Sequence, residues 1–182
     1  MIITIAGNKG SGKSSVALAI KEIYTDRRIA IIHFADPFKH LVQEMFGYTD
    51  EQLWGPSSAR DTRTGLFPDF TCRDVLISVG TWGRSLDPDI WAKMAVRKAH
   101  EIHKENHLVI IPDCRKPNEA EAVRAAGGIV VRKLGDPESA ADYTHETETM
   151  VEKIRADVTI PFVEDVGDLA EVVLAALGPC MP

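Results

Sequence analysis

Residues 2–15 read IITIAGNKGSGKSS, and this stretch decides the fold of the chain. The β-branched run at residues 2–5 is typical of a buried strand, and residues 15–24 have the pattern of a helix. Residues 7–14, between them, match G-x-x-x-x-G-K-[ST], a phosphate-binding loop that joins a strand to a helix. Glycines in such a loop let successive backbone N–H groups and the positive end of the helix point at one anion. The sequence therefore predicts a nucleoside triphosphate site.

The side chains of this loop have distinct chemical roles. Lys13 supplies a positive charge for the phosphates, and Ser14 supplies a hydroxyl that can bind Mg²⁺. A glycine turn that binds no ligand is the alternative interpretation. The residues expected to contact the nucleotide are Gly7, Asn8, Lys9, Gly10, Ser11, Gly12, Lys13, Ser14 and Ser15.

The composition favours one globular domain and excludes several function classes. The 182 residues are 45% hydrophobic and 26% charged, which suits a packed core. A formal net charge of -6 argues against binding to nucleic acid polymers, because that activity relies on a basic surface. The three cysteines are far apart and lack C-x-x-C spacing, so we expect neither disulfides nor a zinc site. No apolar run approaches membrane-spanning length, and we expect a soluble protein of the cytoplasm.

Strand and helix patterns alternate along the rest of the chain. The expected strands are residues 29–34, 108–111, 128–133 and 158–162, and the expected helices are residues 38–46, 73–84, 89–105, 118–126 and 165–177. Each strand is a continuous apolar run, which indicates a parallel sheet that is buried on both faces. We therefore expect a three-layer α/β fold of the P-loop NTPase type, with about five parallel strands flanked by helices, in one domain over residues 1–182.

Two segments are polar and irregular. Residues 47–71 carry glycines and prolines among polar residues, and residues 135–150 are rich in acids, threonine and histidine. We expect the first to be a mobile insertion that binds substrate and the second to be a lid. A plain surface connection is the alternative for each.

Asp113 and Arg115 follow the predicted strand at residues 108–111. A carboxylate in this position emerges at the carboxyl end of a central strand and can hold Mg²⁺ together with Ser14. A turn or cap acid is the alternative for Asp113. The planar guanidinium of Arg115 suits bidentate phosphate binding. Surface solvation is the alternative for Arg115.

Arg73, Gly80 and Arg84 fall on one face of the predicted helix at residues 73–84. A glycine inside a helix costs about 1 kcal/mol against alanine, so Gly80 suggests that something approaches the backbone there. Tight helix packing at Gly80 is the alternative. The two arginines are roughly 16 Å apart along the helix and cannot easily hold one phosphate. One is expected at the acceptor phosphate, and the other at the base, the sugar or the transferred group.

Three further residues have two interpretations each. Trp82 points away from Gly80 in a regular helix and is then expected in the core, whereas a break near Gly83 would expose it to a ligand. Trp91 either stacks on a base or packs in the core, and Lys39 either contacts a phosphate or is solvated.

Taken together, these stretches resemble the bacteriophage deoxynucleoside monophosphate kinases, which belong to the P-loop nucleoside monophosphate kinase group. The resemblance runs over most of the chain. It rests on residues 6–14, 36–39 and 73–84, on Asp89, Trp91, Asp113 and Arg115, on residues 117–119, and on His145 and Glu146. The chain departs from the family pattern at Ser14, where an acid is frequent, and at Lys116, where an aromatic residue is frequent.

The resemblance implies transfer of the γ-phosphoryl group of ATP to a deoxynucleoside 5′-monophosphate, with Mg²⁺, for the supply of DNA precursors. It implies a small-molecule substrate, without a membrane or a nucleic acid polymer, and the host cytoplasm if the chain is phage-encoded; a homodimer stays open. The residues then expected to take part in catalysis are Lys13, Arg84, Asp113 and Arg115. With Lys39 and Trp91 from the patterns above, the residues expected at the substrate are Lys39, Arg73, Gly80, Thr81, Trp82, Arg84, Trp91, Arg115 and Glu119.

Two alternatives to this function remain. A kinase of another small metabolite on the same fold, such as dephospho-coenzyme A, is the first. A nucleotide-dependent regulatory switch is the second, although the chain has no [NT]-K-x-D base-reading motif.

Overall fold

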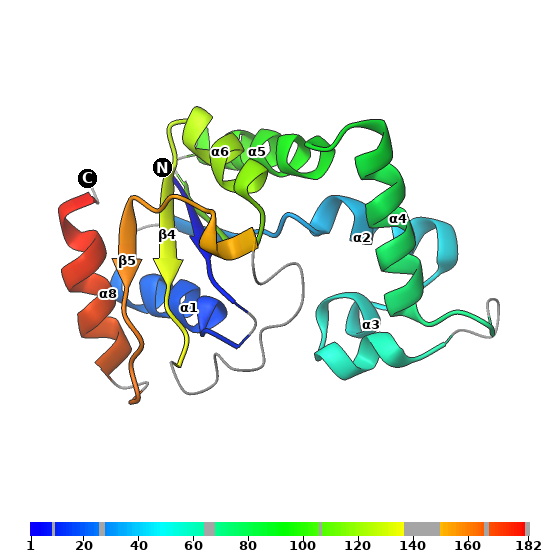
Figure 1. Cartoon of the computed structure of the whole chain (residues 1–182), viewed down its shortest axis with the longest axis horizontal. Helices are drawn as coiled ribbons and strands as arrows, with labels where there is room; N and C mark the ends of the chain where they lie inside the picture. The colour runs from blue at the N-terminus through cyan, green and yellow to red at the C-terminus, as the bar shows by residue number, and fades with distance from the viewer. Residues whose placement is uncertain are drawn as a thin grey trace. The chain divides into compact units, whose positions relative to one another are not determined.

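Apolar runs of the sequence form a five-stranded sheet in the computed structural model, in the order β2-β3-β1-β4-β5. Figure 1 shows β4 and β5 side by side, with α8 (Leu169–Leu177) next to β5. The strands are β1 (Ile2–Ala6), β2 (Arg28–Ile31), β3 (His107–Cys114), β4 (Ile129–Lys133) and β5 (Val158–Ile160). All four neighbouring pairs are parallel. The structure describes residues 1–8, 10–25, 28–63, 68–105, 107–136, 150–165 and 168–180.

Helices cover both faces of the sheet. α1 (Lys13–Ile23) and α8 (Leu169–Leu177) share one core with Ile3 and Ile5 of β1. α6 (Pro117–Ala125) packs against β1 and β4, and its buried Val123 lies outside that core. Because side chains alternate between the faces of a strand, α6 covers the opposite face. The predicted three-layer α/β fold with about five parallel strands is therefore confirmed.

The chain folds into two compact units. Unit 1 comprises residues 1–34 and 96–182 and contains the sheet, whereas unit 2 comprises residues 35–95. Unit 2 contains α2 (Asp36–Phe46), α3 (Asp50–Trp54), the 3₁₀ helix η1 (Ser57–Asp61) and α4 (Cys72–Leu86), and α5 (Ile90–His103) begins in unit 2 and continues in unit 1. A single domain over residues 1–182 stays a prediction.

Part of the segment 47–71 belongs to a core, contrary to the sequence-based expectation. Tyr48 and Leu53 are buried in the apolar cluster of unit 2. α3 begins here because Thr49 and Gln52 form a capping box: Gln52 N donates to Thr49 Oγ1 at 3.3 Å, and Thr49 N donates to Gln52 Oε1 at 2.9 Å. Residues 64–67 lie outside the described residues, as does most of the predicted lid at 135–150, of which the structure describes only residues 135, 136 and 150.

Several element ends differ from the sequence-based prediction. The strand expected at 29–34 ends at Ile31, and the helix expected from residue 165 begins at Leu169. Leu169, Val173 and Leu177 are buried at a spacing of four, so the apolar periodicity of the helix starts only there. β5 ends at Ile160, because Pro161 follows and cannot donate a hydrogen bond to a strand ladder.

The two glycines of α4 differ in what surrounds them. The indole Nε1 of buried Trp91 donates to Gly80 O at 2.9 Å. A Cβ on Gly83 would lie 2.1 Å from Cζ2 of Trp91, whereas a Cβ on Gly80 would meet only the guanidinium of Arg84, at 3.4 Å or more. The close approach therefore occurs at Gly83, and Trp91 packs within unit 2.

We expect Gly83→Ala to lower the free energy of unfolding by about 2 kcal/mol, because the Trp91 ring has to move to make room for the methyl group. Gly80→Ala is the matched control. It is expected to be neutral or stabilising by up to about 1 kcal/mol, since alanine favours a helix and the side chain nearby can move. Unfolding in urea measures both variants. Equal stabilities would contradict the packing described for Trp91.

Candidate active site

The backbone of the Gly7–Ser14 loop is arranged to receive an anion. Gly10 and Gly12 have φ angles of 81° and 85°, which L side chains rarely adopt. Gly12 is the N-cap residue of α1 and offers no side-chain hydrogen bond to the first N–H groups of that helix. These N–H groups and the helix dipole therefore favour an anion at this end of α1.

Gly7 and Ser11 lie in close contact inside the loop. A Cβ on Gly7 would lie 2.5 Å from Ser11 Oγ and 2.7 Å from Lys133 O, so only glycine fits there. Ser11 Oγ and Asn8 Oδ1 are buried and have no hydrogen-bond partner within the described part of the chain. Two polar atoms of the loop therefore remain for a ligand or water. Lys9 lies outside the described residues.

Lys13 is held over its own loop. Its Nζ donates to Gly7 O at 2.7 Å and to Asn8 O at 2.5 Å, and the side chain is 7% exposed. A buried ammonium that carbonyl oxygens hold in place is a fixed positive charge for an incoming phosphate.

A pocket of about 350 Å³ opens beside this loop within unit 1. It brings together six of the residues that the sequence predicts for the site, and it adds two others. The lining residues are Gly10, Gly12, Lys13, Ser14, His33, Pro112, Asp113 and Arg115. His33 belongs to no sequence motif. Its place beside the loop depends on how β2 pairs with β3, so the sequence alone does not identify it.

Asp113 reaches the pocket because β3 continues farther than the sequence predicts. The strand runs through Pro112 to Cys114, and its register with β1 shifts between Thr4 and Ala6. A bulge of this kind tolerates a proline in a central strand. Phe34 N donates to Asp113 Oδ1 at 3.0 Å, which fixes the carboxylate at the carboxyl end of the sheet.

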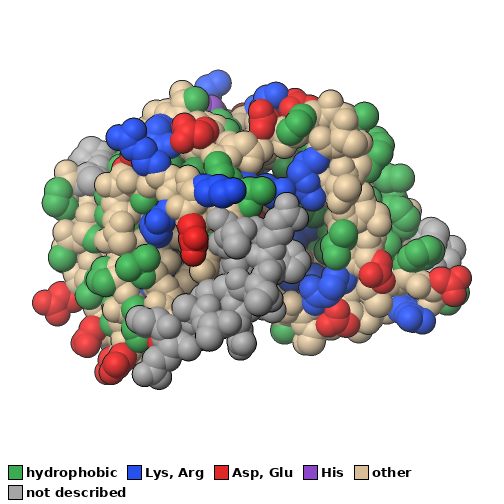
Figure 2. All heavy atoms as spheres, viewed as in Figure 1, with side chains coloured by type: hydrophobic (Ala, Val, Ile, Leu, Met, Phe, Trp, Pro, Cys, Tyr) green, Lys and Arg blue, Asp and Glu red, His purple; other side chains and the backbone are tan. Residues whose placement is uncertain are grey.

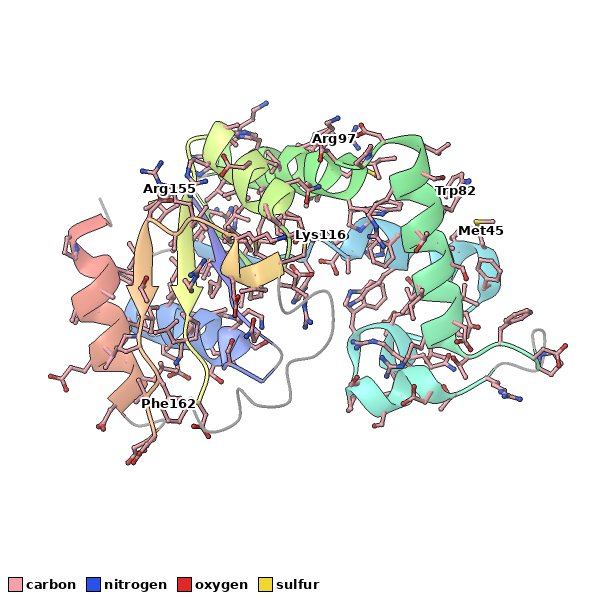
Figure 3. The ribbon with its side chains drawn as sticks, viewed as in Figure 1. Met45, Trp82, Arg97, Lys116, Arg155 and Phe162 are labelled. Atoms are coloured by element: carbon pink, nitrogen blue, oxygen red, sulfur yellow. The ribbon has the colours of Figure 1, made fainter. Side chains whose placement is uncertain are left out.

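Glu119 fixes the turn from which Arg115 projects. Its Oε2 accepts the backbone N–H of Arg115 at 2.8 Å and that of Lys116 at 3.0 Å. Figure 3 shows Lys116 where the chain enters α6. Burial raises the pKa of Glu119 to about 7; the negative charge of Asp113 adds to this shift, and the two backbone N–H groups oppose it.

The stability of the protein is expected to fall as the pH rises from about 4.5 to about 7. Glu119 has an ordinary pKa of 4.5 and a pKa of about 7 in the folded chain, so the folded state binds more protons in this window. Glu119→Gln removes this contribution and gains stability relative to the unsubstituted protein across the same window. Urea unfolding at a series of pH values measures the difference, and a difference that is independent of pH would contradict the shifted pKa.

The substrate residues predicted on α2 and α4 belong to unit 2. Lys39 is buried, with its Nζ 5.5 Å from the ring centroid of Trp54. Arg73 Nε donates to Asp61 Oδ1 at 2.6 Å, and Arg73 also donates to Ser57 O. The hydrogen bond to Asp61 raises the pKa of Arg73 and lowers that of Asp61. Part of the Arg73 charge is therefore neutralised inside the protein.

Positive charges gather around Cys72 in unit 2. Burial raises the pKa of the Cys72 thiol, and the charges of Arg60, Lys39 and Arg73 oppose this shift. Arg60, on η1, is a residue that sequence reasoning missed, because the segment 47–71 was expected to be irregular.

The helix face of Arg73, Gly80 and Arg84 is formed as the spacing predicts, because α4 is continuous. The Arg84 guanidinium lies over Gly80, and Arg84 makes no ion pair with any residue that the structure describes. Thr81 is exposed. Trp82 is 56% exposed, so the expectation that it is buried in the core is wrong; α4 turns its neighbours Gly80 and Gly83 inward instead.

The comparisons with known proteins point to kinases. A protein of Acanthamoeba polyphaga mimivirus, named "putative deoxynucleotide monophosphate kinase", is 28% identical over 169 residues, which cover 86% of this chain and 84% of that protein. No family model matches the sequence.

Solved kinase structures share the fold. A sugar kinase from Janibacter sp. HTCC2649 has a TM-score of 0.51 at 13% identity and covers 97% of this chain and 94% of that one. The dephospho-CoA kinase from Campylobacter jejuni has a TM-score of 0.51 at 12% identity, with coverages of 96% and 94%. A gluconokinase from Sinorhizobium meliloti 1021 has a TM-score of 0.50 at 16% identity, with coverages of 98% and 91%. At these identities the likeness establishes the fold.

The described residues contain neither a membrane-spanning helix nor a cluster of metal-binding side chains. No helix among them is long and apolar enough to cross a membrane. Nowhere in the described ranges do three His, Cys, Asp or Glu side chains gather in a way that could hold a metal ion.

Proposed function

We propose that this protein is a deoxynucleoside monophosphate kinase, which transfers the γ-phosphoryl group of ATP to a deoxynucleoside monophosphate in the cytoplasm. The pocket of unit 1 carries the proposal, because Lys13, Ser14 and Asp113 lie together there. The similarity to the mimivirus protein and the resemblance to bacteriophage kinases support a deoxynucleoside monophosphate as the acceptor.

The donor phosphates are proposed to bind at the Gly7–Ser14 loop. Phosphoryl transfer needs little covalent chemistry from the protein; it needs fixed geometry and neutralised charge. The N–H groups at the start of α1 and the ammonium of Lys13 supply both. Arg115 lines the same pocket and is proposed to stabilise the transferred group.

Ser14 and Asp113 fit Mg²⁺. A hydroxyl and a carboxylate are the hard oxygen ligands that this ion prefers, and it usually keeps only one or two protein ligands beside phosphates and water. Both side chains line the pocket, and Ser14 is exposed to it. The ion, when bound, neutralises charge on the phosphates.

Asp113→Asn is expected to raise the Mg²⁺ concentration needed for half-maximal activity about tenfold or more, because an amide is a weaker ligand than a carboxylate. The amide oxygen can still accept from Phe34 N, so the loop should keep its place. Activity measured over a Mg²⁺ titration tests this. Asp168→Asn, at an exposed carboxylate beside α8, is the control, and equal Mg²⁺ requirements for both variants would remove Asp113 from the metal site.

The acceptor is proposed to bind residues of unit 2. Arg84 is the first candidate for its phosphate, because no carboxylate of the described chain neutralises the guanidinium. Lys39, Arg60 and Arg73 add positive charge near Cys72. In a chain with a formal net charge of -6, such local positive charge favours an anionic substrate.

A substrate screen tests the function. ADP release is measured with ATP, Mg²⁺ and, in turn, the four deoxynucleoside monophosphates, their ribose counterparts, dephospho-coenzyme A and gluconate. We expect kcat/KM for at least one deoxynucleoside monophosphate to exceed that of the last two compounds at least tenfold. ADP release with only dephospho-coenzyme A or gluconate would replace the proposed acceptor, and release that needs no acceptor would indicate a hydrolase or a switch.

A further inference from the structure

Lys133, the last residue of β4, is a buried cation that no motif includes. The residue is 4% exposed. Its Nζ donates to Leu134 O at 2.8 Å and to Pro161 O at 2.7 Å. It therefore connects the chain after β4 to the chain after β5. Its Nζ also lies 5.7 Å from the ring centroid of Phe162, which Figure 3 shows beyond the carboxyl end of β5.

This side chain lies directly behind the phosphate-binding loop. A Cβ on Gly12 would lie 3.8 Å from Lys133 Cε, and a Cβ on Gly7 would lie 2.7 Å from Lys133 O. Gly12 also lines the pocket of unit 1. The Lys133 side chain therefore packs against a loop residue, Gly12, that lines the pocket where an anion is expected.

No carboxylate in the described ranges forms an ion pair with Lys133. The side chain contacts carbonyl oxygens and an aromatic ring instead. Burial lowers the pKa of Lys133, since an ammonium loses its hydration there. A buried charge of this kind gains stability from a nearby anion.

The surface around α8 is not a source of positive charge. Figure 2 shows acidic side chains on the part of unit 1 that carries α8, and Glu164, Asp165, Asp168 and Glu171 are exposed. This surface therefore supplies no positive charge for a polyphosphate.

We propose that Lys133 is a second cation of the donor-phosphate site: its charge acts on the nucleotide phosphates from behind the Gly7–Ser14 loop and raises affinity with each added phosphate. This inference rests on the proposed function, because it takes ATP as the ligand of the Gly7–Ser14 loop. It extends that function by assigning part of the discrimination between ATP, ADP and AMP to one buried lysine. If Lys133 only connects the chain after β4 to the chain after β5, its substitution would instead change the affinity for all adenine ligands equally.

Calorimetry with ATP, ADP, AMP and adenosine separates these two roles. Lys133→Met is expected to weaken ATP binding about tenfold and ADP binding less, while adenosine changes by no more than about twofold. Lys133→Arg keeps the charge and is expected to stay within about threefold of the unsubstituted protein for ATP. Lys98→Met, at an exposed lysine of α5, is the matched control and should change nothing.

A measurement on the unsubstituted protein covers the case in which Lys133→Met does not fold. With ¹³C-labelled lysine, the Cε resonance of Lys133 should titrate at a higher pH with ADP than with adenosine. Equal titration with both ligands would overturn the inference, as would unchanged ATP binding by Lys133→Met or an equal loss of ATP and adenosine. If the unsubstituted protein binds no adenine nucleotide, the proposed function itself fails; if it binds ATP and only the lysine effects are missing, the function stands.

Discussion

Replacing Lys13 with alanine is expected to lower kcat by about 10²- to 10³-fold, because the variant lacks the fixed charge that stabilises the transferred phosphoryl group. The ammonium of Lys13 is held by Gly7 O and Asn8 O, within the loop that is proposed to bind the donor phosphates. Steady-state kinetics with saturating ATP and deoxynucleoside monophosphate measure the effect, and circular dichroism checks that the fold is kept.

Lys21→Ala is the control for this variant. Lys21 is an exposed lysine in the last turn of the same helix, α1, and its removal should change kcat by no more than about twofold. A Lys13→Ala enzyme with the kcat of the control would remove Lys13, and with it the Gly7–Ser14 loop, from the reaction.

Arg84→Ala is expected to raise KM for the monophosphate by about 10- to 100-fold while KM for ATP changes by no more than about threefold. No carboxylate in the described part of the chain pairs with the Arg84 guanidinium, and a charge-assisted hydrogen bond to a phosphate contributes about 1.5–3 kcal/mol. Initial rates over a grid of both substrate concentrations separate the two constants.

Variants of two other arginines serve as comparisons for Arg84→Ala. Arg97, which Figure 3 shows on α5, is exposed, and Arg97→Ala should leave both constants unchanged. Arg73→Ala should raise KM for the monophosphate less than Arg84→Ala does, because Asp61 already neutralises part of the Arg73 charge. A larger effect of Arg84→Ala on ATP than on the monophosphate would mean that donor and acceptor residues are exchanged.

The fold could be predicted because its signals are local. The loop at residues 7–14 identifies the strand before it and the helix after it, and continuous apolar runs mark the other strands. The pocket of unit 1 follows from the same logic, since the carboxyl ends of parallel strands meet at one edge of the sheet. Asp113 and Arg115 therefore line the same pocket as Ser14, and their roles there stay predictions.

What the sequence does not reveal depends on contacts between distant residues. The extension of β3 through Pro112 requires a bulge against β1, which only the register of the two strands determines. The helical spacing correctly predicts that Trp82 points away from Gly80. It does not predict that Trp82 is exposed, because helical spacing carries no information about what packs on a helix face. His33 and Lys133 are single residues without a motif, and their places beside the loop arise from strand pairing.

α3 is a different case, because a local sequence signal marks its start and the sequence-based prediction does not use that signal. Thr49 and Gln52 have the spacing of a capping box, and the glycines and prolines around them hid it. The same pattern at Thr71 and Asp74 starts α4. Capping residues three positions apart therefore indicate a helix even in a segment that is rich in glycine and proline.

The γ-phosphoryl group itself gives the most direct test of the proposed activity. The protein is incubated with Mg²⁺, a deoxynucleoside monophosphate and ATP labelled in its γ-phosphoryl group, and the products are separated. We expect the label in the β-phosphate of the deoxynucleoside diphosphate, in an amount equal to the ADP formed. Label found only in inorganic phosphate, with every deoxynucleoside monophosphate supplied, would contradict the proposed activity.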